Sequence, residues 1–464
     1  MSGAVKTTGA VELRRFRPYP AYKDSGVEWL GQIPAHWEVK RIKLVAALNP
    51  PASEVRSLPT ETEVSVVPME AVGEYGGLDL SATKQLGDVG SGYTYFRDGD
   101  VVVAKITPCF ENGKGAHASG LANGIAFGTT ELHVLRVAHE LDDRFLFYLT
   151  LSDPFRRLGE ADMYGAGGQK RISESFVENF RSPLPPIPEQ RAIAAFLDRE
   201  TAKIDASVAK KERLIELLQE KRTALITRAV TKGLDPNVAM KDSGVEWLGE
   251  IPAHWESLSL SRVTLSRCDG PFGSGLKSEH YSNSGVRVIR LQNIGWTEFS
   301  DVDRAYIDAD YANELGDHSV QAGDLLIAGL GDERHPVGRA CVAPDGIEPA
   351  MVKADCFRFR LDRRRINPRF AAFQLSASAT AAAGSLATGA TRTRMNLSAT
   401  ASRRIALPPL NEQQAILKTL DEEESRHLPV IAKIRGAIDR LQEIRSAIIS
   451  AAVTGKIDVR EEAA

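Results

Sequence analysis

The sequence predicts an α+β protein with internal pseudo-twofold symmetry, in which two mixed α/β domains are joined by two long helices that pair as an antiparallel coiled coil. Residues 23–38, KDSGVEWLGQIPAHWE, return 218 residues later as KDSGVEWLGEIPAHWE at 241–256, identical at fifteen of sixteen positions. LPPIPEQ at 184–190 likewise returns as LPPLNEQ at 407–413. This spacing is far longer than the period of a solenoid or propeller, so it indicates a duplicated domain.

Two long helices are predicted from the segments that follow these second repeats. Residues 188–230 contain no glycine and no internal proline. Apolar residues recur there with the period of a helix, at Leu197, Ile204, Val208, Ile215, Leu218, Leu225 and Ala229. The second copy keeps this face, and Pro429 interrupts it, so we expect a kink or break there. The apolar face of each helix must be buried, and the equivalent face of the other repeated helix is the best-matching surface. This favours pairing of the two helices as a coiled coil. Packing of each helix within its own domain is the alternative.

The repeats also set the expected domain boundaries. The chain of 464 residues is too long for one core. We expect an N-terminal tail at 1–20, an α/β domain at 21–183, a long helix at 184–235, a second α/β domain at 236–406, a second long helix at 407–458 and a C-terminal tail at 459–464. Within the domains, alternating or continuous apolar runs predict strands at 64–70, 100–106, 286–294 and 324–330. Shorter helices are expected at 145–150 and 370–378.

Composition and motifs favour a binding protein over an enzyme. The net charge of −3 argues neither for nor against nucleic acid. The four cysteines lack metal-ligand spacing, so we expect free thiols, no metal site and a cytoplasmic location. Residues 270–278, GPFGSGLKS, resemble a phosphate-binding loop, but Leu276 moves Lys277 out of register. Asn49 and the two prolines after it are followed by Ala52, where a base-flipping methyltransferase would need an aromatic residue, so we expect a turn after a strand.

Cations beside small-residue loops are the main binding signal. Residues 358–404 contain ten arginines against one carboxylate, Asp362, and such a segment attracts polyanions. The alternative is that these arginines only solubilise a surface. TGATRTR at 388–394 aligns with GAGGQKR at 165–171, which places Arg171 on Arg394. Loops of this kind can lie against a DNA backbone.

The ordered set of motifs resembles the specificity subunit of type I restriction-modification systems. The motifs are GVEWLGxIPxHW, the PME of VVPMEAV, RLQNI, DGPFGS at 269–274, GD followed by apolar residues, and LPPxxEQ before a long helix. The resemblance covers residues 20 to 458. It implies two target recognition domains that read the halves of a bipartite site in double-stranded DNA, roughly one helical turn apart. It also implies two methyltransferase subunits and motor-nuclease subunits as partners, which would use S-adenosylmethionine, ATP and Mg, while this chain binds no cofactor and is not catalytic.

Under this resemblance, phosphate contacts position the complex and a few side chains read base edges. The candidate residues are Lys105, Gln169, Lys170 and Arg171 in the first domain, and Lys277, Arg290, Gln292, Asn293, Arg392 and Arg394 in the second. Lys105 aligns with Gly329, so any role it has is not shared by both halves. Two alternatives stay open: a modification-only methyltransferase system, and a coiled-coil scaffold that binds no DNA.

Overall fold

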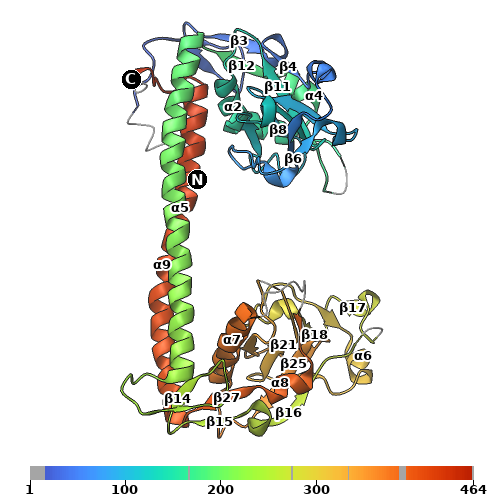
Figure 1. Ribbon diagram of the computed structural model, residues 1–464, viewed down its shortest axis with the longest axis vertical. Helices are drawn as coiled ribbons and strands as arrows, with labels where there is room; N and C mark the ends of the chain where they lie inside the picture. Colours follow the sequence, from blue (N-terminus) through green and yellow to red (C-terminus); the bar gives the residue numbers. More distant parts are fainter. Residues whose placement is uncertain (1–15, 166–167, 273–274, 333, 386–392, 462–464) are drawn as a thin grey trace, which may run out of the picture. The chain divides into compact units, whose positions relative to one another are not determined.

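A computed structural model describes residues 16–165, 168–272, 275–332, 334–385 and 393–461 of the chain (Figure 1). The chain divides into two compact units. Unit 1 comprises residues 1–212 and 434–464, and unit 2 comprises residues 213–433. Each unit holds an α/β domain and part of both long helices, so helix and sheet are mixed throughout and the predicted α+β class is confirmed.

The two long helices, α5 (Ile187–Lys232) and α9 (Leu410–Val453), are where the sequence predicts them (Figure 1). In unit 1, Leu197 near the start of α5 shares a hydrophobic core with Ile448 near the end of α9. In unit 2, Val230 near the end of α5 shares a core with Leu420 near the start of α9. Within each unit the helices therefore run in opposite directions, and each long helix contributes to both units.

The break expected at Pro429 does not occur, because α9 continues as an α-helix through this residue. Proline lacks an N–H, so it leaves the carbonyl of Ser425, one turn earlier, without its helical partner. Ser425 and Pro429 are both exposed, and water can satisfy that carbonyl. The proline is therefore tolerated at this surface position.

Unit 1 carries two small sheets that pack face to face. Its strands begin with the hairpin β1 (Tyr22–Asp24) and β2 (Gln32–Pro34) and with β3 (Glu38–Arg41), which pairs antiparallel with β12 (Arg181–Leu184). One sheet has the order β4 (Ala46–Leu48), β11 (Leu132–Val137), β8 (Val101–Ala104), β9 (Gly115–His117). The other has the order β6 (Thr83–Gln85), β5 (Glu63–Val67), β10 (Ile125–Gly128), β7 (Thr94–Arg97). Val102 and Val134 of the first sheet and Phe96 and Ala126 of the second form one core. Helices α2 (Asp143–Leu151), α3 (Asp153–Asp162) and α4 (Glu174–Asn179) follow.

Unit 2 repeats this plan with different details. The hairpin is β13 (Met240–Asp242) and β14 (Glu250–Pro252), and β15 (Glu256–Ser259) pairs with β27 (Arg404–Leu407). One sheet has the order β16 (Thr264–Cys268), β25 (Cys356–Leu361), β21 (Leu325–Ala328), β23 (Ala340–Val342). The other has the order β17 (Tyr281–Ser282), β19 (Tyr306–Ile307), β18 (Val286–Ile289), β24 (Ala350–Val352), β20 (Ser319–Val320). The remaining elements are α6 (Ala309–Glu314), α7 (Pro368–Ser385), α8 (Leu397–Ser402), and β22 (Leu330–Gly331), which pairs with β26 (Thr393–Arg394).

The strands and short helices expected inside the two domains are confirmed. The expected strands contain β8, β18 and β21 and overlap β5, and the expected helices lie within α2 and α7. The cysteines are free, and burial raises the pKa of Cys341 to about 12. Among the described residues, no group of His, Cys, Asp or Glu side chains could hold a metal ion. Nor is any helix of that part of the chain long and apolar enough to cross a membrane.

A buried ion pair explains the GD motif that both units share. Asp100 is 1% exposed and accepts hydrogen bonds from Nε and Nη2 of Arg136 on the neighbouring strand, at 2.8 and 2.7 Å. In unit 2, Asp324 is 2% exposed and accepts the same two bonds from Arg360, at 2.9 and 2.8 Å. A forked guanidinium–carboxylate pair of this kind fixes the relative position of two strands. The GD motif is therefore structural.

The EQ dipeptide of LPPxxEQ joins the start of each long helix to its unit. Glu189 accepts hydrogen bonds at 2.7 Å from His36 and 3.0 Å from Trp37, and Glu412 lies 2.8 Å from His254. These glutamates are the partners of the IPAHW histidines, which sequence reasoning did not identify. The histidines lie beside the tryptophans, as expected, but they also help to attach the helix.

The glutamine of the dipeptide also attaches the start of the long helix to its unit, through hydrogen bonds to backbone groups. The buried Gln190 side chain accepts from the N–H of Asp142 and donates to the carbonyls of Glu140 and Pro185, at 2.7, 3.0 and 2.8 Å. Gln413 makes the equivalent three bonds in unit 2. Because a buried amide must satisfy its donors and acceptor internally, this network allows little variation. It accounts for the repetition of this motif.

Candidate nucleic-acid interface

Three segments of unit 1 meet at one edge of its α/β domain, which we call loop edge 1. The segments are 68–78, 105–114 and 168–171. Thr107 joins the second segment to the third: its N–H donates to the carbonyl of Lys170 and its hydroxyl to the carbonyl of Gly168, at 2.9 and 2.8 Å. Lys114 joins the second segment to the first, with Nζ 3.0 Å from the carbonyl of Met69. Loop edge 1 is therefore one connected surface.

The equivalent segments of unit 2 form loop edge 2. They are 290–300, 329–339 and 393–395. The buried Arg339, 5% exposed, joins the first two segments. Its guanidinium donates to the carbonyls of Leu291, Ile294, Leu330, His335 and Pro336 at 2.8–3.3 Å. An open hollow of ≈ 540 Å³ lies between these segments.

Each loop edge begins with a tight hairpin after a buried strand. Residues 72 and 78 form a β-bridge in unit 1, as residues 294 and 299 do in unit 2. Glycine is required at the start of the turn, because a Cβ on Gly73 would lie 2.2 Å from the carbonyl oxygen of Gly76, and one on Gly295 2.6 Å from that of Glu298. We call residues 68–78 hairpin 1 and residues 290–300 hairpin 2.

The candidate residues of unit 1 all lie at loop edge 1. Gln169 and Lys170 are exposed, and Lys105 is half-buried. Arg171 is already paired, since its Nε and Nη2 donate to the two carboxylate oxygens of Glu131 at 2.8 and 2.7 Å. These bonds hold the pKa of Glu131 below its usual range. Arg171 therefore fixes the third segment, and Gln169 and Lys170 are the side chains it presents.

The candidate residues of hairpin 2 divide into two kinds. Arg290 forms an ion pair with Asp303, and the exposed Gln292 donates to the same carboxylate. Asn293 is fully buried, and its side-chain amide binds the carbonyls of Ser300 and Val302 at 2.9 and 3.1 Å. The polar atoms of Asn293 shape the hairpin, and its expected role in base reading stays a prediction.

The other candidate residues of unit 2 do not form one cluster. Lys277 is exposed and lies outside the segments of loop edge 2, 3.6 Å from the carboxylate of Glu279. Arg394 is at loop edge 2, where its Nε donates to Asp355 at 2.8 Å and its guanidinium lies 5.5 Å from the exposed ring of Phe272. Arg392 lies outside the described residues.

The described part of the arginine-rich segment 358–404 is not a free basic patch. Arg358 is buried, Arg403 is half-buried, and both bind oxygen atoms of the unit itself. Arg369 makes a forked pair with Asp421, and Arg360, Arg365 and Arg394 pair with Asp324, Glu256 and Asp355. The carboxylates lie 36 to 109 residues away in sequence, so counting charges within the segment missed them. These arginines stabilise the fold, a role that differs from both polyanion binding and the solubilising of a surface.

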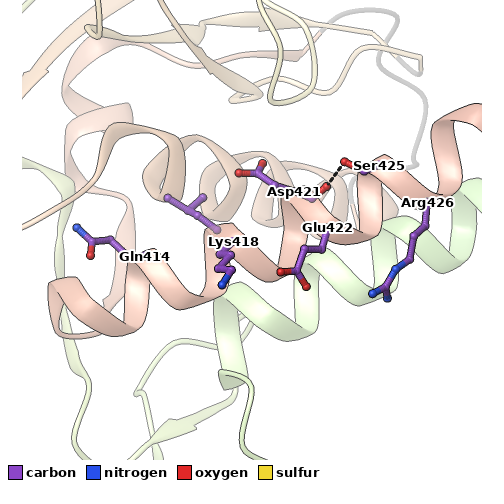
Figure 2. A pocket seen from close by; sticks show the side chains of 7 residues that line it. Gln414, Lys418, Asp421, Glu422, Ser425 and Arg426 are labelled. Carbon is purple, nitrogen blue, oxygen red and sulfur yellow. Dashed lines mark hydrogen bonds between the residues drawn. The ribbon is translucent and has the colours of Figure 1, made fainter.

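A separate shallow hollow lies on α9 in unit 2, lined by Gln414, Leu417, Lys418, Asp421, Glu422, Ser425 and Arg426 (Figure 2). Asp421 is already bound there, by Arg369 through its carboxylate and by the Ser425 hydroxyl through its carbonyl, at 2.8 Å. Gln414, Lys418 and Glu422 are spaced four residues apart on one exposed face. The hollow offers a polar helix surface.

Part of the chain is similar to known proteins. Residues 34–217 match the type I restriction modification DNA specificity domain. The specificity subunit of the type I restriction enzyme EcoAI from Escherichia coli is 38% identical over 184 residues, which cover 39% of this chain and 30% of that relative. Residues 34–217 therefore carry a type I restriction modification DNA specificity domain. A putative specificity subunit of the enzyme MjaX from Methanocaldococcus jannaschii is 23% identical over 93% of this chain and 96% of that protein.

A likeness in fold to a solved structure extends over nearly the whole chain. A chain from a solved structure concerned with complex assembly and conformational transition of the type I R-M system aligns with a TM-score of 0.63 at 18% identity, covering 91% of this chain and 98% of that one. The matched specificity domain includes loop edge 1 and the first part of α5, and loop edge 2 lies in the second repeat. The EcoAI match spans under a third of that relative's length.

Proposed function

We propose that this chain is the DNA-recognition subunit of a type I restriction-modification complex, in which loop edge 1 reads one half of a bipartite site and loop edge 2 reads the other. One observation carries the proposal. The two units share the strand order of one sheet, the GD ion pair and the EQ network. Their loop edges nevertheless carry different side chains at equivalent positions: Pro68 and Glu70 of hairpin 1 align with Arg290 and Gln292 of hairpin 2. A common framework with unlike exposed loops suits two different half-sites.

The exposed polar side chains supply two kinds of DNA contact. Lys170 of unit 1 is suited to phosphate, because it is a flexible point charge at the loop surface. Arg290 and Gln292 of unit 2 are suited to base edges in the major groove, where arginine pairs with guanine and glutamine with adenine. Asp303 binds both side chains and so orients them in the free protein. In this proposal the chain carries out no catalytic step and serves as a non-catalytic subunit.

The repeated 16-residue segments support docking of two copies of one partner. Lys23, Glu28 and Ala35 are exposed, as are their identical counterparts Lys241, Glu246 and Ala253. Internal packing does not explain identity at exposed positions, whereas an identical binding surface does. We infer that two methyltransferase subunits bind these segments, supplying the S-adenosylmethionine chemistry, and that motor-nuclease subunits add the ATP- and Mg-dependent steps.

The long helices support a spacer role. Their antiparallel packing within each unit is what a continuous antiparallel coiled coil with pseudo-twofold symmetry would produce, and we propose that arrangement for α5 and α9. The helices expose Leu214, Leu217, Leu428 and Val430 in unit 2, at 43–50%. Exposed apolar side chains of this size favour a further protein contact. We also propose that the α/β domains span residues 21–183 and 236–406 and that the long-helix segments span residues 184–235 and 407–458.

Mapping of methylated adenines across the host genome, with and without this gene, tests the proposed function. We expect one split motif, two short blocks of specified bases around an unspecified spacer, to lose methylation when the gene is removed. A methylation map that does not change would contradict DNA recognition and favour a scaffold that binds no DNA. Methylation without cleavage of unmodified incoming DNA would instead identify a modification-only system.

Replacing Lys170 by alanine tests the phosphate contact at loop edge 1. We expect the assembled complex to bind cognate and non-cognate DNA more weakly by a similar factor, and the slope of log affinity against log salt to fall by about 0.9. Titrations at several salt concentrations measure both. The control is Lys84→Ala, an exposed lysine of unit 1 on β6, outside loop edge 1. An unchanged salt slope for Lys170→Ala would exclude this contact.

A further inference from the structure

An arginine of a long helix stacks on an aromatic residue at the tip of each hairpin. In unit 1, the guanidinium of Arg445 on α9 lies 5.1 Å from the ring centre of Tyr75, which is part of hairpin 1. In unit 2, the guanidinium of Arg222 on α5 lies 5.5 Å from the ring centre of Trp296, which is part of hairpin 2. Arg222 and Arg445 are equivalent positions of the duplicated helices, 223 residues apart. The same contact therefore occurs independently in both units.

Each arginine is also anchored to the other helix. Arg445 of α9 forms an ion pair with Asp205 of α5, and Arg222 of α5 forms one with Glu424 of α9. Arg222 has a second carboxylate, Glu298 of hairpin 2, at 3.7 Å. One guanidinium thus connects both helices to the hairpin tip.

Backbone and side-chain hydrogen bonds connect the tip of each hairpin to the neighbouring segments of its unit. The N–H of Tyr75 donates to the carbonyl of Gly113 in the second segment of loop edge 1, at 3.1 Å. In hairpin 2, Trp296 lies four residues after Gln292, and its Nε1 donates to the carbonyl of Ser376 on α7 at 3.2 Å. Both hairpins are closed by bridges, so a shift of the tip moves the residues at their other end.

The stability of the fold does not explain why arginine occupies positions 222 and 445. The Nε of Arg222 and that of Arg445 are buried without a hydrogen-bond partner among the described residues. Burial also lowers the pKa of Arg445. A buried ion pair adds little net stability compared with apolar side chains of the same size, but it can specify one geometry. A hollow of ≈ 660 Å³ lies beside Arg445, between residues 74–78, α2 and both helices.

We propose that Arg445 and Arg222 are positioning residues that hold hairpin 1 and hairpin 2 in their reading positions. The inference rests on the proposed function. It adds that the long helix of each repeat positions the hairpin of the other unit. Arg222 belongs to the helix of the first repeat but acts on the half-site read by unit 2. Arg445 belongs to the helix of the second repeat but acts on the half-site read by unit 1.

The test replaces Arg445 by methionine, which has a similar length, retains contact with the Tyr75 ring and removes the planar charge. Asp205 is 62% exposed and stays solvated after the change. The control is Arg440→Met, an exposed arginine of α9 in unit 1. The reciprocal variant combines Arg222→Met with Glu424→Gln, because Glu424 is only 17% exposed and would otherwise lose its partner. Its control is the exposed Arg228→Met in unit 2.

Each variant chain is expressed with its methyltransferase subunit in a host that lacks the gene, and methylated adenines are mapped. With Arg445→Met, we expect sites with one mismatched base in the first half-site to be methylated about tenfold more than with the wild type, since one mismatch normally costs a factor of this order. The second half-site keeps its specificity. The reciprocal variant relaxes the second half-site alone, and both controls reproduce the wild-type motif.

Hydrogen exchange separates this inference from the proposed function. In the purified Arg445→Met chain, we expect the amide of Tyr75 to exchange at least tenfold faster than in Arg440→Met, with β8 and β11 unchanged. A wild-type chain that directs no split motif would refute the proposed function, while the exchange result would still test the contact. The positioning role would be overturned by an unaltered motif in Arg445→Met, by equal relaxation of both half-sites, or by faster exchange throughout unit 1.

Discussion

Replacing Asp324 by alanine is expected to destabilise unit 2 by about 3 kcal/mol and to leave unit 1 unchanged. The substitution removes both acceptors of Arg360 and leaves this guanidinium between two buried strands without its partner. It also removes the acceptor of the N–H of Gln321. Breaking a buried pair on one side costs roughly 3–5 kcal/mol, and the lower end applies because the Arg360 side chain is 32% exposed.

Amide hydrogen exchange measures this loss unit by unit. We expect amides of β21 and β25 to lose protection in Asp324→Ala, whereas those of β8 and β11, which carry the intact Asp100 pair, serve as an internal reference. The exposed Asp345→Ala is the matched control, with an expected change within about 0.5 kcal/mol. Equal protection in the Asp324 and Asp345 variants would show that the pair does not support the sheet.

Replacing Arg339 by alanine is the second change with a large expected effect, and it acts on loop edge 2. The five carbonyls that this guanidinium binds would lose their donor, and hairpin 2 would lose its link to the second segment. Hydrogen bonds to a charged group contribute roughly 1.5–3 kcal/mol each but are not additive, so we expect a loss of about 3–5 kcal/mol in local stability. Under the proposed function, reading of the second half-site should fail, while the first half-site stays specified.

Urea unfolding of unit 2 and methylation mapping check the two parts of this expectation. Arg334→Ala is the stability control, because Arg334 is an exposed arginine of the same segment. Its expected effect is within about 0.5 kcal/mol. A variant of Arg339 that keeps wild-type unfolding would show that the segments hold together without it. A stable variant that still specifies both half-sites would remove loop edge 2 from DNA recognition.

The elements of the fold that depend on local pattern could be predicted from the sequence. Duplication, the limits of α5 and the main buried strands follow from repeated residues and from periodicity, which are visible within one segment. Pro429 was misjudged because the cost of a proline depends on whether its freed carbonyl reaches water, and burial is not visible in sequence.

The candidate site could be predicted only in part, because its side chains are paired over long distances. Gln169 and Lys170 lie at loop edge 1, where small flanking residues and cations indicated a surface loop. Asn293 and Arg171 have the right chemistry but are used internally, by partners that only the folded chain brings near. Arg339 was missed, although an arginine directly before the apolar strand Ala340–Val342 was an available signal of a buried charge. The alignment of Arg222 with Arg445 was visible, but the aromatic rings beneath them were not.

The strand pairs β3–β12 and β15–β27 would allow one α/β domain to be replaced by another. Glu38 of β3 pairs with Leu184 of β12, and Glu256 of β15 pairs with Leu407 of β27, so the residues that open and close each domain are neighbours across a ladder. Another domain whose ends meet at the same separation would fit between these strands without altering the path of the helices. Under the proposed function, new combinations of half-sites can therefore arise by recombination within the repeated segments, with no redesign of the surfaces that bind the partner subunits.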